Sequence, residues 1–268
     1  MTRVQTRCGG IAFTEHGTGL PLVLLHASLC DRHDFDPIIP ALAGRYRVIA
    51  VDWPWHGESD SPPPPLKAGA GLFAGVLEDF TQALALGPAA FIGNSVGGFA
   101  AARLAITHPE RVAGLVLVNS GGFIPMNLLT GAFCTLMGTP VLTRVLLPPY
   151  MRLTMSPMTG DDREVVRRVA ARARTAEGMR TGAALWRSFA RPEHDLRSRA
   201  AQLRAPTLIV WGTKDIGLPP RAGRATHAAI AGSRLEVLDT GHMPFSSDPQ
   251  AFLSLVIPFV DLASRHET

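Results

Sequence analysis

The stretch Gly93-Asn94-Ser95-Val96-Gly97-Gly98 decides the fold. It follows a short apolar run, Ala89 to Ile92, and precedes a run with helical spacing from Phe99 to His108, which Pro109 ends. This order predicts a strand, a sharp turn and a helix, with a serine at the turn, in the pattern G-x-S-x-G. Small residues suit such a turn because strand and helix nearly touch there and a Cβ would crowd them. The turn would lift the Ser95 hydroxyl clear of the sheet and direct the first amides of the helix at the same space.

The same six residues would also suit a glycine-rich turn with an exposed serine and no chemistry, so the rest of the chain must decide. Through the first 120 residues, short apolar runs alternate with runs of helical spacing. This alternation predicts a mostly parallel sheet with helices on both faces, which is an α/β fold. We expect strands at Gly10–Glu15 (an edge strand), Leu20–Leu25, Tyr46–Val51, Ala89–Ile92 and Val112–Val118, and helices within Phe35–Leu42, Leu72–Leu84 and Phe99–His108.

The alternation stops after residue 120 and resumes near residue 200. Between them we find no strong strand pattern, while Val165–Ala173 and Thr181–Ala190 have helical spacing. We therefore expect a helical cap over residues 121–199, inserted into a core formed by residues 1–120 and 200–268. The remaining elements of the core are expected as strands at Pro206–Trp211 and Leu235–Leu238 and helices at Pro219–Ile230 and Pro249–Ala263.

Composition narrows the class of protein. The 268 residues are 46% apolar, and the net charge is +4 with an isoelectric point near 9.4. An arginine-rich surface explains that charge, because no aromatic-interleaved basic patch or phosphate loop indicates nucleic acid. The three cysteines are far apart and give no disulfide framework or zinc spacing. No apolar run approaches the ~20 residues of a membrane helix. We expect a soluble, cytoplasmic monomer or homodimer without export signal, nucleic-acid partner or membrane partner, acting on a small molecule.

Three residues carry complementary chemistry. Ser95, Asp215 and His242 each follow the end of an expected parallel strand, and ligands bind at that edge of an open α/β sheet. An imidazole can take the proton of a serine during attack and return it to the leaving group. A carboxylate fixes the tautomer of the imidazole and stabilises its charged form. Each residue alone would be an ordinary turn or loop residue, but together, in the order serine, acid, histidine, they predict a catalytic triad.

The chain resembles the α/β-hydrolase superfamily over nearly its whole length, and above all its small capped esterases, perhydrolases and carbon–carbon hydrolases. The matching stretches are His26-Ala27-Ser28, Asp52 through Ser59, Gly93 to Gly97, Trp211 to Asp215, and Gly241-His242. The resemblance implies that Val96 N–H and Ser28 N–H form an oxyanion hole, with Ala27 as the alternative to Ser28. It also implies that Asp52 and His56 brace the fold. Ala27 and Trp55 stand where glycine is common in the family.

The family acid can also follow the strand that ends at Val118, but Asn119 and Ser120 there cannot serve. This leaves Asp215 as the expected acid and Asp239, three residues before His242, as the weaker candidate. Asp52 is a third carboxylate at a strand end.

The resemblance implies hydrolysis of a carboxylic ester or related acyl substrate with an apolar part, through an acyl-enzyme and without metal or organic cofactor. Among the apolar residues of the cap and of the loop after His242, we expect Trp186, Phe123 and Met243 to contact the substrate. One alternative is a carbon–carbon hydrolase of a vinylogous diketone acid, whose carboxylate Arg187 or Arg191 would bind. A non-catalytic ligand receptor on the same fold is the other alternative.

Overall fold

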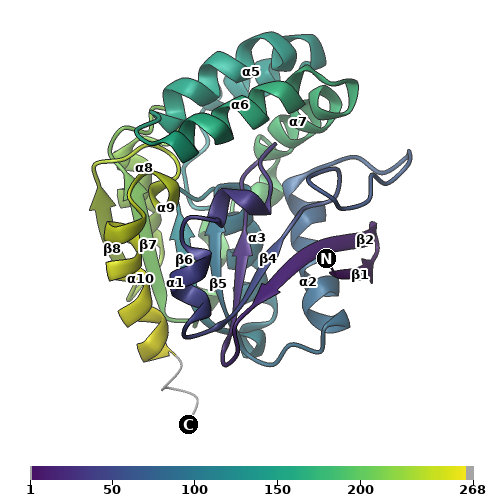
Figure 1. The fold of residues 1–268 in the computed structure, drawn as a ribbon. Helices are drawn as coiled ribbons and strands as arrows, with labels where there is room; N and C mark the ends of the chain where they lie inside the picture. Colours follow the sequence, from purple (N-terminus) through teal and green to yellow (C-terminus); the bar gives the residue numbers. More distant parts are fainter. Residues whose placement is uncertain (1, 264–268) are drawn as a thin grey trace.

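The computed structural model describes residues 2–263 and contains an eight-stranded sheet with helices on both faces (Figure 1). The strands lie in the order β1-β2-β4-β3-β5-β6-β7-β8. From β4 to β8, each neighbouring pair is parallel. The predicted α/β fold is therefore confirmed. The strands are β1 (Thr2–Thr6), β2 (Gly9–His16), β3 (Pro21–Leu25), β4 (Arg47–Val51), β5 (Ala89–Asn94), β6 (Val112–Val118), β7 (Thr207–Gly212) and β8 (Arg234–Leu238).

The edge of the sheet differs from the expectation. The strand predicted at Gly10–Glu15 is present as β2, but it pairs antiparallel with β4 on one side and with β1 on the other, so its predicted place at the edge is wrong. The edge strand is β1, which is mostly exposed and carries Val4 as its one strongly apolar residue. A short exposed strand of this kind has no alternation that periodicity could detect.

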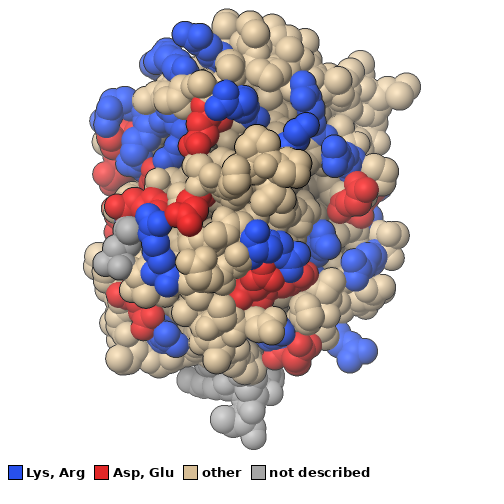
Figure 2. Space-filling view, turned by 90° about the vertical axis from the view of Figure 1, so that its right-hand side faces the viewer, with Lys and Arg blue, Asp and Glu red and all other residues tan. Residues whose placement is uncertain are grey.

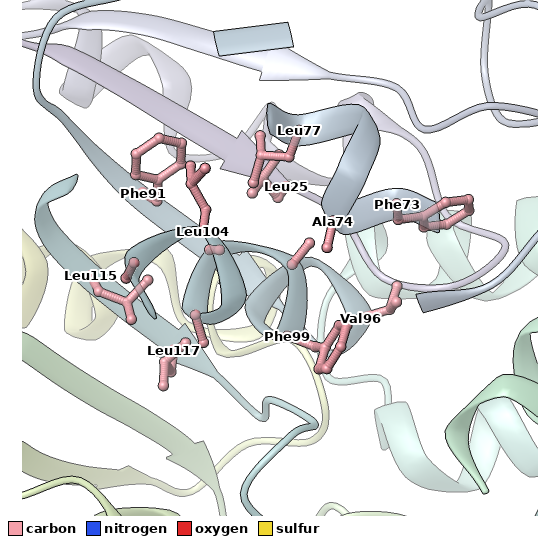
Figure 3. Close-up of a cluster of buried hydrophobic side chains, with 14 of the residues drawn as sticks. Leu25, Phe73, Ala74, Leu77, Phe91, Val96, Phe99, Leu104, Leu115 and Leu117 are labelled. Atoms are coloured by element: carbon pink, nitrogen blue, oxygen red, sulfur yellow. The ribbon is translucent and has the colours of Figure 1, made fainter. Parts of the chain in front are cut away.

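Two apolar layers hold helices against the sheet. α2 (Ala70–Ala83), α3 (Val96–Thr107) and α8 (Pro220–Ala229) cover one face, and α1 (Ile39–Ala43), α9 (Pro244–Ser247) and α10 (Pro249–Ala263) contribute to the other. Figure 3 shows the first layer, in which Phe99 and Leu104 of α3 lie among side chains of β5, β6 and α2. The helix expected within Phe35–Leu42 is shorter, since Pro37 separates the 3-10 turn η1 (Arg32–Phe35) from α1.

Residues 121–199, which we call the cap, lie between β6 and β7 and are described throughout. They contain helices and no strand: α4 (Leu128–Met137), α5 (Pro140–Met155), α6 (Gly160–Arg174), α7 (Ala176–Phe189) and the 3-10 turn η3 (Pro192–His194), with η4 (Arg197–Gln202) at their end. Figure 1 shows α5, α6 and α7 lying across one end of the sheet. No single helix within residues 2–263 is long and apolar enough to cross a membrane, although α4 and α5, bent by 107° relative to each other, pass that test as a pair.

Candidate active site

Ser95 lies at the corner between β5 and α3. Its backbone has φ 55° and ψ −114°, a sparsely populated conformation that costs on the order of 1–3 kcal/mol. The Ser95 N–H donates to the Val118 carbonyl at 3.0 Å, and the Ser95 carbonyl accepts from Phe99 N–H and Gly121 N–H. The corner is therefore held by the strand beside it and by the helix that follows it.

The glycines around Ser95 are required by contact and not by their φ angles, none of which is positive. A Cβ on Gly93 would lie 2.5 Å from the Gly98 Cα. A Cβ on Gly97 would collide with the Leu25 carbonyl at the end of β3. Strand, corner and helix thus approach as closely as the sequence pattern predicted.

Asp215 follows β7, His242 follows β8, and their side chains meet. The Nδ1 of His242 lies 2.6 Å from Oδ2 of Asp215, and both side chains are buried. Because a carboxylate only accepts, we assign the proton of a neutral imidazole to Nδ1. Nε2 is then left as an acceptor, which is the state that a general base needs.

The Asp215 carboxylate is fixed by three further hydrogen bonds. Oδ1 accepts from the N–H groups of Gly217 at 2.9 Å and Leu218 at 3.0 Å, and Oδ2 accepts from Asn119 Nδ2 at 2.7 Å. Asn119 is itself held because its Oδ1 accepts from Gly212 N–H. Sequence reasoning excluded Asn119 as an acid and gave it no role, yet it orients the carboxylate.

The other two carboxylates that the sequence offered lie elsewhere. The Asp239 side chain is 80% exposed and forms an ion pair with Lys214 at 2.9 Å. Asp52 is buried, and its carboxylate accepts hydrogen bonds from the backbone N–H and the guanidinium group of Arg32. Of the three candidates, Asp215 is the one within hydrogen-bond distance of His242.

The main chain of His242 is tied to both parts of the molecule. Its carbonyl accepts from Asn94 Nδ2 at 3.0 Å, so the residue before Ser95 also holds the histidine loop. Its N–H donates to the Thr154 carbonyl at the end of α5. The position of the imidazole therefore depends on β5 and on the cap, a link that no local sequence pattern reveals.

Ser28 and Val96, the expected oxyanion donors, lie beside Ser95 and His242 around one cavity. Neither N–H donates to another residue within 2–263, so both are free for a ligand. Ala27, the alternative donor, lines the same cavity. The Ser28 Oγ is also buried without a partner among the described residues. Two free amides at one wall are what a developing oxyanion requires.

The loop that carries Ser28 is held from two sides. The Leu29 N–H donates to Nε2 of His56 at 3.1 Å. Burial lowers the pKa of His56 well below its usual value, which keeps that nitrogen unprotonated. From the cap, Arg172 of α6 donates to the carbonyls of Leu29, at 3.0 Å, and Cys30. Leu29 itself has a φ of 61°, so these contacts stabilise a strained turn.

The cavity has a volume of about 150 Å³. On the same measure one buried water needs only ~10–15 Å³, so the space fits an organic ligand. The lining combines core residues, among them Ser95, His242 and Asp215, with residues of the cap.

Comparison with known proteins decides the family. A family model described as the alpha/beta hydrolase fold matches residues 21–249. The chain belongs to the α/β-hydrolase fold family. It is 30% identical over 253 residues to a pimeloyl-[acyl-carrier protein] methyl ester esterase of Neisseria meningitidis serogroup C, covering 89% of this chain and 92% of the relative.

Among solved structures, a thermophilic esterase from Thermogutta terrifontis matches with a TM-score of 0.81 at 24% identity, covering 98% of each chain. A meta-cleavage product hydrolase from Pseudomonas fluorescens IP01 matches with a TM-score of 0.78 at 22% identity, also over 98% of each chain. At these identities the structures establish a shared fold. With the family model and the esterase relatives, they identify this chain as an α/β-fold hydrolase.

In this hydrolase the cap supplies an aromatic wall. Phe133 of α4, Tyr150 of α5 and Trp186 of α7 contact one another, with ring centroids 5.4–5.6 Å apart. Phe189 packs on Trp186 at 5.5 Å. All four line the cavity, and such pairs contribute packing energy beyond simple burial. No Lys or Arg is among the lining residues that the structure describes.

Of the three residues expected to contact substrate, Trp186 lines the cavity and the other two do not. Phe123 is fully buried in the layer that contains α3, and Met243 is buried in the opposite layer. Both apolar side chains therefore pack in the core, in the apolar layers on the two faces of the sheet. Their apolar character predicted burial correctly but could not distinguish a core contact from a cavity wall.

His194 of η3 is a cavity residue that the sequence analysis missed. Its ring stacks on Phe99 at 4.5 Å and lies 5.1 Å from Phe189. Nε2 is buried and has no hydrogen-bond partner among residues 2–263. Burial lowers the pKa of His194 to about 4, so the ring is neutral near pH 7. It lies in a polar, arginine-rich stretch without any motif, so no sequence signal marks it.

Within residues 2–263 there is no group of three or more His, Cys, Asp or Glu residues placed to hold a metal ion. Cys134 lines the cavity, and burial raises the pKa of its thiol to about 11. A thiol with that pKa stays protonated near neutral pH and is a poor nucleophile. Ser95 is therefore the better nucleophile candidate of the two.

Proposed function

We propose that this chain is a serine hydrolase that cleaves a neutral carboxylic ester with an apolar part through an acyl-enzyme. Ser95 is the nucleophile, His242 is the general base and then general acid, and Asp215 orients the imidazole. Val96 N–H and Ser28 N–H stabilise the oxyanion. The observation that carries the proposal is that Ser95, His242 and the residues of two free amides line one cavity, together with mostly apolar residues that include four aromatic side chains.

The reaction follows from this arrangement. As Ser95 Oγ bonds to the ester carbonyl carbon, its proton passes to Nε2 of His242, and the carbonyl oxygen becomes an oxyanion facing the two amides. The proton then passes to the alcohol oxygen as the carbon–oxygen bond breaks, which leaves an acyl-Ser95. Water repeats the sequence, and the acid and free Ser95 are released. The carboxylate of Asp215 stabilises the imidazolium in both halves.

A neutral substrate is favoured because the cavity offers no cation. A substrate carboxylate in an apolar pocket would need a charged partner, since an unpaired buried charge is costly. Arg187 and Arg191, which the carbon–carbon alternative would use, are exposed and do not line the cavity. The neutral His194 adds a polar but uncharged ring to the lining, which suits an ester.

The similarity to pimeloyl-[acyl-carrier protein] methyl ester esterases supports an ester substrate and adds a methyl ester of an aliphatic acid to the compounds worth testing. The similarity to the meta-cleavage product hydrolase is at the level of fold and does not by itself favour carbon–carbon cleavage. A non-catalytic receptor would bind apolar ligands in the same cavity without turnover, so a turnover assay separates the two.

The experiment is a panel of p-nitrophenyl and methyl esters from acetyl to dodecanoyl, with a vinylogous diketone acid alongside. We expect ester turnover that Ser95→Ala abolishes, and little carbon–carbon cleavage. Trp186→Ala should change KM and the preferred chain length several-fold with a smaller change in kcat, because it removes a wall and leaves Ser95 and His242 in place. Efficient cleavage of the diketone acid, or ligand-induced thermal shifts without turnover, would contradict the proposal.

A further inference from the structure

The outer surface of α4 and α5 exposes large apolar side chains. Leu128 is 93% exposed and Leu129 83% exposed at the start of α4. On α5, three more side chains, Val141, Val145 and Leu153, are at least 60% exposed. Scattered apolar residues on a surface are ordinary, but a cluster on two consecutive helices marks an interaction site. We call these five residues the apolar cap face.

The two helices that carry the apolar cap face have positive and no negative side chains. No acidic residue occurs between Glu110 and Asp161, a stretch that includes all of α4 and α5. α5 carries Arg144 and Arg152, each next to a residue of the apolar cap face; both are exposed, and neither side chain has an ion pair or hydrogen bond among residues 2–263. The whole cap has twelve arginines against six acidic residues, while the rest of the chain has more acidic than basic residues.

Figure 2 agrees with this distribution. The uppermost part of the face that it shows, where Figure 1 places the cap, is largely tan with blue groups beside it. Most of the red side chains on that face lie lower on the molecule. The positive charge and the uncharged surface therefore occur together at the cap end.

The apolar cap face is continuous with the mouth of the cavity. Met126, two residues before Leu128, lines the cavity and is itself partly exposed. Phe133, one turn beyond Leu129 on α4, also lines the cavity and reaches the surface. An apolar path therefore leads from the exposed leucines to the aromatic wall above Ser95.

We propose that the apolar cap face docks on an anionic lipid surface, with Leu128 and Leu129 inserted among the acyl chains and Arg144 and Arg152 against the headgroup phosphates. Exposed apolar residues flanked by arginines are the signature of helices that lie in a membrane interface. Each basic residue near an anionic surface adds an attraction that salt screens. Docking in this way requires no helix to cross the bilayer.

A second copy of the chain fits this surface less well. A symmetric dimer through the apolar cap face would bring the arginines of two α5 helices together. Neither α4 nor α5 carries an acidic side chain to pair with them. An anionic lipid surface supplies both the apolar phase and the counter-charge. The proposal differs from the expectation of no membrane partner, which rested on the sequence alone and could not take account of which leucines are exposed.

Docking itself does not depend on the proposed function, whereas delivery of an apolar ester from the lipid to Ser95 rests on it. The test is therefore a binding measurement first. Purified full-length protein is floated with vesicles of phosphatidylglycerol and phosphatidylcholine, and separately with phosphatidylcholine alone, at about 50 mM and about 500 mM NaCl. We expect binding to the anionic vesicles that falls with salt, and at least ~10-fold weaker binding to the neutral ones.

Two double variants separate the contributions of the leucines and of the arginines to vesicle binding. Leu128→Ser with Leu129→Ser should weaken vesicle binding at least ~10-fold, and Arg144→Gln with Arg152→Gln should weaken it and reduce its salt dependence. Val237→Ser, an exposed apolar residue on β8 of the core, is the matched control and should leave binding unchanged. All five substituted residues lie outside the cavity lining, so hydrolysis of a water-soluble ester should persist in each variant.

Three results would overturn docking. One is no binding of the wild type to anionic vesicles. A second is binding that the double leucine variant retains in full. A third is a dimer, seen by analytical ultracentrifugation and lost in the leucine variant, without vesicle binding, because the apolar cap face would then be a contact between copies. Absence of ester hydrolysis with vesicle binding intact would instead contradict the proposed function alone.

Discussion

On the core side of the cavity, polar groups are fixed by hydrogen bonds, whereas on the cap side aromatic rings are held by packing against one another. Asp215 accepts four hydrogen bonds, and the Ser95 corner is held by contacts to β6, α3 and the loop after β6. The rings of Phe133, Tyr150 and Trp186 meet from three different helices. Under the proposed function, the core would position the reacting groups and the cap would set the shape of the space for the substrate.

The difference predicts where substitutions act. A change on the core side should reduce kcat, because the affected contact is made to the reacting atoms. A change on the cap side should redistribute substrates, since packed rings can be replaced by other apolar groups of similar volume. Substitutions that remove a contact between cap and core should reduce kcat by an intermediate amount.

The largest effect should come from the acid. We expect Asp215→Asn to fold normally and to lose at least ~10²-fold in kcat, because an amide no longer selects the tautomer with Nε2 free. Asp239→Asn is the control, and as an exposed partner of Lys214 it should cost less than ~10-fold. Steady-state kinetics on the best ester of the panel provides the measurement. If the two variants ranked in the opposite order, the acid would be misassigned.

A smaller loss of kcat should come from the contact between α6 and the loop that carries Ser28, the proposed oxyanion donor. Arg172→Met removes the donors to the Leu29 and Cys30 carbonyls. Losing an oxyanion donor outright costs ~10²–10³ in kcat, so loosening its loop should cost about 10-fold, with little change in KM. Arg174→Met, at an exposed residue two positions along the helix, is the matched control. An unchanged kcat in Arg172→Met would mean that the core alone holds the loop.

The smallest effect should appear in the pH dependence of stability, at a second contact of α6, the ion pair of Arg168 with Asp34. Burial, with the nearby charge of Asp31, raises the pKa of Asp34 to about 7, against the attraction of Arg168 of α6. Between the ordinary aspartate pKa and this value, the folded protein binds more protons at Asp34 than the unfolded chain does. The free energy of unfolding therefore falls as pH rises through that window.

Asp34→Asn removes this contribution. From pH about 5 to about 8, the melting temperature of the wild type should fall more than that of the variant, by a few degrees. Glu177→Gln, at an exposed carboxylate of α7, should behave as the wild type. Identical pH dependence in Asp34→Asn and the wild type would show that Asp34 stays ionised in the fold.

Much of the core could be predicted from the sequence because its signals are local. The apolar runs of β3, β5 and β6 and the glycines around Ser95 are visible without any tertiary information. The strand-end positions of Asp215 and His242 follow from the same runs. The roles of Asn119 and Asn94 could not be predicted, because each hydrogen bond joins loops that are distant in sequence.

The packing of the cap, in contrast, could not be predicted from local sequence signals. Phe123 and Phe133 are equally apolar in the sequence, yet the first is buried against the sheet and the second lines the cavity. The exposure of Leu128 and the burial of Leu147 likewise depend on how α4 and α5 pack on the other helices. Helical periodicity gives the faces of a helix, and only the packing shows which face meets the substrate.

The central claim is that Ser95 is an activated nucleophile, and covalent labelling tests it most directly. Folded wild-type protein is treated with a fluorophosphonate and measured by intact-protein mass spectrometry, with Ser95→Ala in parallel. We predict a single adduct on the wild type, located on Ser95 by peptide mapping, and none on the variant. No labelling of the folded wild type, or the same adduct on Ser95→Ala, would contradict the account.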